Sequence, residues 1–163
     1  MLEKVIKMVK KIKNNEEFNS LIEDLISNET VLKMKNYRQH FNVSCYEHCY
    51  NVSLDCYRIA KKLRLDYKSI ARAAMVHDLF LYDWRTKQEG RTGLHAFSHG
   101  KTACENALKE FDLNKKEQDM IIKHMWPVTL MPPKSIEGFI LTIVDKYSTL
   151  NEGIKYLLKK KNI

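Results

Sequence analysis

Glycine and proline are scarce in this chain, and this scarcity limits the folds open to it. Among 163 residues there are only five glycines and three prolines. A domain of many short strands needs these residues for its turns, whereas long helices need few of them. Hydrophobic residues make up 44% and charged residues 29%, a composition typical of a folded globule. The sequence therefore predicts an all-α domain of ordinary size.

Apolar residues recur at helical spacing along most of the chain. Asp66, Ser98 and Asn114 stand where N-caps are expected. We expect residues 1–36 to form an N-terminal helical segment that packs on the core, and residues 37–163 to form the main helical bundle. The predicted helices cover residues 2–13, 16–26, 43–63, 67–81, 99–111, 115–125 and 135–150.

The four cysteines indicate a reducing compartment. Cys45, Cys49 and Cys56 fall on one predicted helix and Cys104 stands apart, so small apolar fillers are expected rather than a disulfide frame. Cys45, His48 and Cys49 could begin a zinc site, but no paired Cys-x-x-Cys follows. The sequence has no long apolar span and no secretory signal at its start. We therefore expect a cytoplasmic protein.

The net charge of +8 leaves several kinds of partner open. A basic protein can bind nucleic acid, a membrane surface or an anionic small molecule. The basic residues are spread out, and no basic patch with interleaved aromatic residues is present, which argues against nucleic acid. The apolar stripe of residues 2–13 is short and lacks an aromatic anchor, which argues against a membrane. A positive field that attracts phosphates is the preferred interpretation, and a merely solvated surface is the alternative.

Histidines and aspartates inside apolar segments are the strongest chemical signal. His77 shares a predicted helical face with apolar residues, and Asp78 follows it directly. His48, His124 and Asp145 occupy similar positions in other predicted helices. A buried aspartate costs several kcal/mol unless a cation or strong donors compensate it. Any one of these residues could be an ordinary hydrogen-bonded core residue, but their repetition favours a shared metal site.

The order His48, then His77-Asp78, then Asp145 resembles the H…HD…D signature of the HD-domain superfamily of metal-dependent phosphohydrolases. The resemblance covers roughly residues 43–150, so residues 37–163 would form the HD domain. It implies an all-helical fold in which His48, His77, Asp78 and Asp145 hold one metal ion.

The second ion implied by the resemblance involves two further histidines. His99 and His124 match the extra histidines of binuclear family members, in which Asp78 would bridge both ions. His95 competes with His99, which we favour because it leads directly into a predicted helix. His40 is expected to be an ordinary surface or loop residue. Imidazole and carboxylate ligands suit Fe, Mn, Co or Zn.

The implied reaction is attack of a metal-bound hydroxide on the phosphorus of a small phosphate ester, with nucleotides as candidate substrates. Asp78, Arg85, Lys101 and Lys146 are the catalytic candidates. The cations expected to bind the phosphoryl group are Arg85, Arg91, Lys101 and Lys146, for which a solvated surface role is the alternative.

The segment His77-Asp78-Leu79-Phe80-Leu81-Tyr82-Asp83 does not identify a subgroup. It lacks the Glu-Asp pair of guanosine-tetraphosphate hydrolases and the lysine that follows the Asp in diadenosine-tetraphosphate hydrolases. The substrate therefore stays open. The alternative functions are a di-iron oxygenase of the HD type and a catalytically silent nucleotide-binding module. A homo-oligomer is compatible with the sequence.

Overall fold

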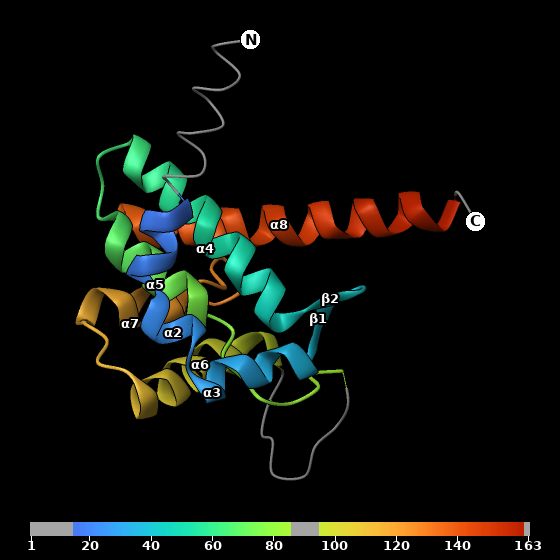
Figure 1. Ribbon diagram of the computed structural model, residues 1–163, viewed down its shortest axis with the longest axis horizontal. Coiled ribbons are helices and arrows are strands. Elements are labelled where there is room, and N and C mark those ends of the chain that lie inside the picture. Colours follow the sequence, from blue (N-terminus) through green and yellow to red (C-terminus); the bar gives the residue numbers. More distant parts are fainter. Residues whose placement is uncertain (1–14, 86–94, 162–163) are drawn as a thin grey trace.

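The computed structural model describes residues 15–85 and 95–161, which form a mainly helical body (Figure 1). Residues 15–21 are helical and are followed by α2 (Glu23–Ile26), α3 (Glu29–Leu32) and the 3-10 helix η1 (Lys33–Asn36). The main helices are α4 (Cys45–Lys62), α5 (Tyr67–Val76), α6 (His95–Glu110), α7 (Lys115–Lys123) and α8 (Ile136–Lys161). The all-α prediction is confirmed.

A two-stranded ribbon, which the sequence did not predict, precedes the main helices. Strand β1 (Arg38–His40) pairs antiparallel with β2 (Val43–Ser44). The ribbon runs directly into α4, where the Ser44 hydroxyl caps the helix by accepting a hydrogen bond from Glu47 N. The predicted helix over residues 43–63 therefore begins only at Cys45.

The core lies where α5 packs between α4 and α7, with α6 against α7 and α8 across α4 and α7. The alanines Ala71, Ala73 and Ala74 are all buried, and they allow α5 to approach α4 closely. The Ser53 hydroxyl donates to Ala71 O at 2.6 Å across that contact. The N-terminal helices contribute buried apolar side chains to the same core, among them Phe18, Ile22, Leu25, Val31 and Met34.

The ends of three helices differ from the predictions. α5 ends at Val76 rather than Leu81, because the chain turns sharply where Phe80 N donates to Asp78 O. α6 begins at His95, so Ser98 lies inside the helix and is not its cap. α8 continues to Lys161 instead of ending near Leu150.

Two of the predicted caps are confirmed. Asp66 caps α5 by accepting a hydrogen bond from Ser69 N. Asn114 forms a capping box with Glu117 at the start of α7. The predicted helix over residues 16–26 is interrupted at Ile22, and the predicted helix over residues 2–13 lies outside the described residues. None of the described helices is both long enough and apolar enough to cross a membrane.

Candidate metal centre

Four buried side chains from three helical segments form one cluster. His48 comes from the first turn of α4, His77 and Asp78 from the turn after α5, and Asp145 from α8. Each offers one candidate ligand atom, and these atoms lie within 4.8 Å of one another. His48 Nε2 is 3.0 Å from Asp145 Oδ1, and His77 Nε2 is 3.4 Å from Asp78 Oδ2. Helices far apart in the sequence thus place imidazole and carboxylate groups around one point.

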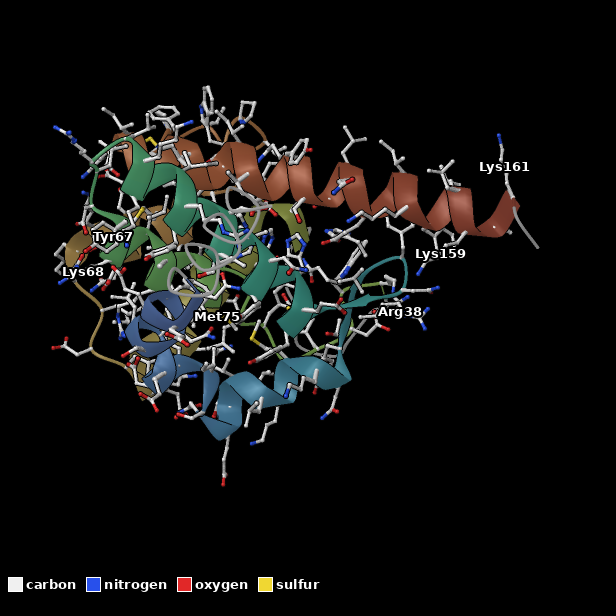
Figure 2. All side chains as sticks on the ribbon, turned by 45° about the horizontal axis from the view of Figure 1, so that its top comes forward. Arg38, Tyr67, Lys68, Met75, Lys159 and Lys161 are labelled. Atoms are coloured by element: carbon white, nitrogen blue, oxygen red, sulfur yellow. The ribbon has the colours of Figure 1, made fainter. Side chains whose placement is uncertain are left out.

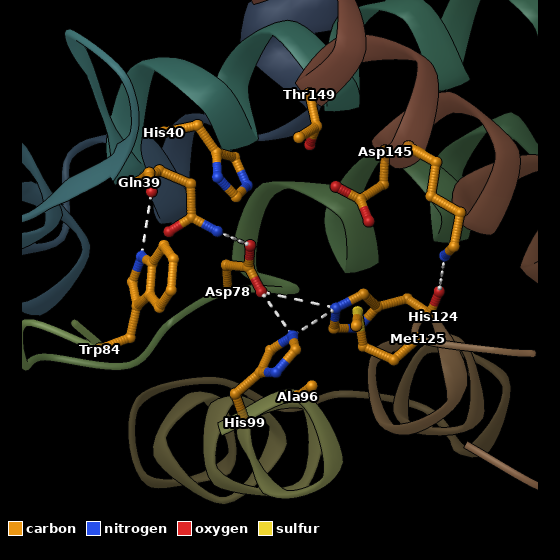
Figure 3. Close-up of a pocket in the computed structure, with 11 residues that line it drawn as sticks. Gln39, His40, Asp78, Trp84, Ala96, His99, His124, Met125, Asp145 and Thr149 are labelled. Carbon is orange, nitrogen blue, oxygen red and sulfur yellow. Dashed lines mark hydrogen bonds and ion pairs between the residues drawn. The ribbon is translucent and has the colours of Figure 1, made fainter. Parts of the chain in front are cut away.

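A second cluster shares Asp78 with the first. Asp78 Oδ1 lies 3.3 Å from His99 Nε2 on α6 and 3.5 Å from His124 Nε2 at the end of α7 (Figure 3). The two Nε2 atoms are 2.8 Å apart. Asp78 is therefore the only described residue common to both groups, with one carboxylate oxygen near each.

The same local geometry orients the rings of His77 and His124. His77 is the C-cap of α5 and His124 is the C-cap of α7, both with right-handed helical backbone angles. Each ring donates from Nδ1 to the carbonyl three residues earlier, Ala74 O and Ile121 O, at 2.7 Å in both cases. Because Nδ1 donates to a carbonyl in this arrangement, Nε2 is the ring atom that faces the cluster and could bind a metal ion.

A carboxylate aims the third histidine. His48 Nδ1 lies 2.9 Å from Glu152 Oε1 on α8. The hydroxyl of Ser148, one helical turn earlier on α8, donates to the same oxygen at 3.2 Å. A ligating histidine commonly donates its other N–H to a carboxylate, which orients the ring and raises its basicity. The sequence analysis did not single out Glu152, because its distance from His48 depends on how α8 crosses α4.

Gly100 allows the close packing of α6 on α7 that places His99 beside His124. It follows His99 on α6, where the helix packs against the end of α7. A Cβ atom at this position would meet Ile121 O and Ile122 O at 2.9 Å, which is closer than real Cβ atoms approach. The absence of a side chain therefore allows α6 to approach the backbone of α7 and His99 to reach His124.

Unpaired buried atoms show that the residues fit a cation. His77 Nε2 and Asp78 Oδ1 are both buried, and neither has a hydrogen-bond partner. Leaving buried polar atoms unpaired costs free energy, and here both atoms point toward the cluster. The donor set of imidazole nitrogens and carboxylate oxygens matches the ligands of transition-metal ions. The buried groups could therefore hold metal ions.

The pKa values of the cluster residues are shifted in different directions. Burial lowers the pKa of His124 to about 3, so its ring is neutral and able to coordinate. Burial also lowers the pKa of His48, but hydrogen bonds with Asp145 and Glu152 outweigh burial and raise that pKa well above its ordinary value. Burial alone would raise the pKa of Asp78, whereas the neighbouring His77 and His99 hold it well below its usual range. Asp78 is thus an anion between histidines.

A cavity of about 280 Å³ opens above the two clusters (Figure 3). Gln39 and His40 from β1 form one side of it together with Trp84, whose indole N–H donates to Gln39 O at 3.0 Å. Gln39 Nε2 donates to Asp78 Oδ2 at 2.5 Å. The described lining residues are Gln39, His40, Asp78, Trp84, Ala96, His99, His124, Met125, Asp145, Lys146 and Thr149.

His40 was expected to be an ordinary surface or loop residue, and this prediction was wrong because His40 lines the cavity. Its ring centroid is 5.5 Å from that of His48 and 6.1 Å from that of Trp84. Gln39 and Trp84 were missed as well. The positions of Gln39 and His40 depend on the two-stranded ribbon, which the sequence did not predict.

The cationic candidates are distributed unevenly. Lys146 is half-buried, lines the cavity and donates to His124 O at 3.0 Å. Arg85 is exposed and pairs with Asp83, and it is not among the described lining residues. Lys101 has 75% of its side chain exposed and lies 3.8 Å from Glu105. Arg91 and the side chain of His95 lie outside the described part of the chain.

The cysteines do not join the candidate ligands in the described residues. Cys45, Cys49, Cys56 and Cys104 are buried and free, as the sequence predicted. Cys45 Sγ instead donates to Asp78 O at 3.1 Å and supports the turn that carries His77 and Asp78.

Comparison with known families agrees with the cluster geometry. The family model for the HD domain matches residues 45–150, a span that begins at the start of α4 and ends inside α8. The chain belongs to the HD-domain family. The resemblance stated from the H…HD…D order is thereby confirmed. No curated protein and no solved structure matched the chain significantly. Membership of this HD-domain family associates the chain with metal-dependent phosphohydrolases as a class.

Proposed function

We propose that this HD-domain protein is a metal-dependent phosphohydrolase that acts on a small phosphate ester, with nucleotides among the candidate substrates. One observation carries the proposal. Asp78 lies between two groups of inward-facing ligand atoms at the floor of a cavity. Pairs of metal ions that share a carboxylate are well suited to displacement at phosphorus.

In this proposal His48, His77, Asp78 and Asp145 hold one ion, and Asp78, His99 and His124 hold the other. Fe, Mn, Co and Zn suit these ligands. Bound ions would lower the pKa of a coordinated water and offset charge on the phosphoryl oxygens. The protein groups fix the ligand orientations through Glu152, Ala74 O and Ile121 O.

Lys146 is the proposed phosphoryl-binding cation. Its ammonium group lies close to the second cluster, since it donates to the backbone of His124. Burial lowers the pKa of Lys146, whereas the nearby Asp145 and Asp78 act in the opposite direction. Gln39, His40 and Trp84 would contact the rest of the substrate from the opposite wall.

The four buried free cysteines are compatible with a reducing compartment, and we propose a cytoplasmic location on that basis. Cell fractionation with a tagged chain tests this part of the proposal. Recovery of the protein outside the cytoplasm would contradict it.

The deciding experiment measures metal content and hydrolysis together. Protein purified without chelator, or reconstituted with Mn, Co, Fe or Zn, should contain about two ions per chain and release phosphate or nucleoside monophosphate from a panel of phosphate esters. Asp78→Ala should lose both ions, whereas His124→Ala should lose mainly the second. Equal metal content in both variants and the parent protein would contradict the shared-carboxylate arrangement.

Two other outcomes would favour the alternative functions. Oxygen consumption by the iron-loaded protein, with no phosphate release, would indicate a di-iron oxygenase that uses the same ligands. Stabilisation by nucleotides without turnover, in a protein that takes up no metal, would indicate a silent binding module.

A further inference from the structure

The outer face of α8 carries an apolar seam along nearly its whole length. Its members recur at alternating spacings of four and three residues, and they are Ile136, Ile140, Ile143, Tyr147, Leu150, Ile154 and Leu157. All except the partly buried Ile140 have relative exposures between 48% and 66%, and Leu158 beside the seam is 58% exposed. This 3-4 spacing is that of a coiled coil, in which a helix packs against another helix.

The seam points away from the metal centre. Asp145 and Glu152 lie on the inner face of α8, where they contact His48. Beyond Leu150, the helix extends away from the body toward Lys159 and Lys161 (Figures 1 and 2). Beyond Glu152, which contacts His48, the contacts described for this extension are to the β1–β2 turn, where Phe41 packs on Gly153 and Tyr156. Among residues 15–85 and 95–161, nothing covers this outer apolar face along most of its length, and so long an exposed apolar face is typical of an interaction surface.

We propose that the partner is α8 of a second copy of this chain. A seam over a 26-residue helix, about 39 Å long, needs a helix of similar length beside it. Among the described helices the next longest, α4, has 18 residues, and most of its apolar positions are buried in the core. At half exposure a large side chain offers on the order of 100 Å², so the seam approaches the roughly 800 Å² per partner of a standard interface.

The sequence of the seam favours an antiparallel pair. A two-fold axis between residues 148 and 149 would place Tyr147 opposite Leu150 of the second copy and Ile143 opposite its Ile154. The same register places Ile140 opposite Leu157 of the second copy. A parallel pair would instead bring the two Lys159-Lys160-Lys161 ends together, and like charges repel. The antiparallel arrangement separates these ends and matches one patch with itself, as a two-fold dimer requires. This inference does not depend on the proposed function.

The oligomeric state tests the pairing. Light scattering during size exclusion should give the full chain a mass twice its 19.3 kDa monomer mass. Ile143→Glu and Leu150→Glu should each give a monomer with an unchanged helical circular dichroism spectrum, because both side chains are exposed within one chain. Lys155→Glu, an exposed change off the seam, should leave the dimer intact. A monomeric parent protein at tens of micromolar, or a dimer that survives both seam variants, would overturn the proposal.

Cross-linking tests the direction of the helices. Under mild oxidation, a mixture of Ile143→Cys and Ile154→Cys chains should form a disulfide-linked heterodimer, whereas Ile143→Cys alone should not cross-link. In the antiparallel pair the two copies of residue 143 are about 16 Å apart along the helix axis. Efficient cross-linking of Ile143→Cys with itself would overturn the antiparallel arrangement. A monomer that sediments with phosphatidylserine vesicles would assign the seam to a membrane surface instead and overturn the dimer.

Discussion

His48 Nδ1 lies 2.9 Å from Glu152 Oε1, so the imidazole of His48 is held between Glu152 on one side and Asp145 on the other. His77 and His124 have only backbone carbonyls at the equivalent nitrogen. A carboxylate partner makes a metal-bound imidazole a stronger donor than a carbonyl does. Of these three candidate ligands, His48 is therefore the one whose donor strength depends on a second side chain.

Removal of this partner should weaken the first metal site. We expect Glu152→Ala to lower affinity for one ion by about 10–100-fold, and Glu152→Gln, which keeps an acceptor but not the charge, to lower it less. Competition with a fluorescent chelator measures both affinities. Asp55→Ala, which removes an exposed carboxylate on α4, is the matched control. Unchanged affinity in Glu152→Ala would show that His48 needs no support from Glu152.

A methyl group at residue 100 should disturb the second site selectively. In Gly100→Ala the new Cβ would press on the backbone of α7 at Ile121 and Ile122, so α6 must shift away from α7. This shift separates His99 from His124, while the first cluster contains no residue of α6. We expect the number of bound ions to fall from two toward one by elemental analysis. Ala103→Gly, also on α6, tests for a general loss of helix stability; loss of both ions in Gly100→Ala would argue against a selective effect.

Lys146 and Lys101 should differ in phosphate binding. Lys146 lines the cavity and Lys101 does not, although both were candidates from the sequence. A hydrogen bond to a charged group contributes about 1.5–3 kcal/mol, so Lys146→Met should weaken binding of inorganic phosphate to the metal-loaded protein by about tenfold or more. Lys101→Met should leave the affinity unchanged in isothermal titration calorimetry. If Lys101→Met weakened phosphate binding and Lys146→Met did not, the phosphoryl-binding role would belong to Lys101.

The ion pair of the buried Glu137 should make stability depend on pH. Glu137 Oε1 on α8 accepts a hydrogen bond from Asp66 N, the N-cap of α5, and lies 2.9 Å from Lys116 Nζ of α7. Burial raises the pKa of Glu137, but the bond to Lys116 outweighs it and lowers that pKa below its ordinary value. The stabilisation is therefore complete above the unfolded pKa and is lost as pH falls through the folded pKa.

Glu137→Gln should then be destabilised by about 1–2 kcal/mol at pH 7, with the difference shrinking below about pH 4. Urea unfolding of both proteins across this pH range measures the effect. Glu105→Gln, an exposed change on α6, should show no such trend. A difference that stays constant with pH would mean that the charge of Glu137 contributes nothing.

The sequence predicted much of this molecule because its signals are local. Apolar spacing and capping residues such as Asp66 and Asn114 located the helices, and burial of a histidine next to an aspartate pointed to His77 and Asp78. His99 was preferred over His95 on helix position, and the structure brings His99 to the cluster. The metal-binding role of these residues remains a prediction.

Features that depend on tertiary packing could not be predicted. Gln39 and His40 reach the cavity only because a two-stranded ribbon folds beside α4. Glu152 meets His48 across 104 positions of sequence, and no local pattern signals that contact. The end of α8 was placed too early, near Leu150, whereas the helix continues to Lys161.

The positions of His77 and His124 as C-caps have an electrostatic consequence. The carbonyl end of a helix carries roughly half a negative charge, and α5 and α7 direct their carbonyl ends at the same place as Asp78 and Asp145. These two carbonyl ends therefore add to the attraction that Asp78 and Asp145 exert on a cation, and they oppose the approach of a phosphate. We therefore expect inorganic phosphate to bind more tightly to the metal-loaded protein than to the protein without metal.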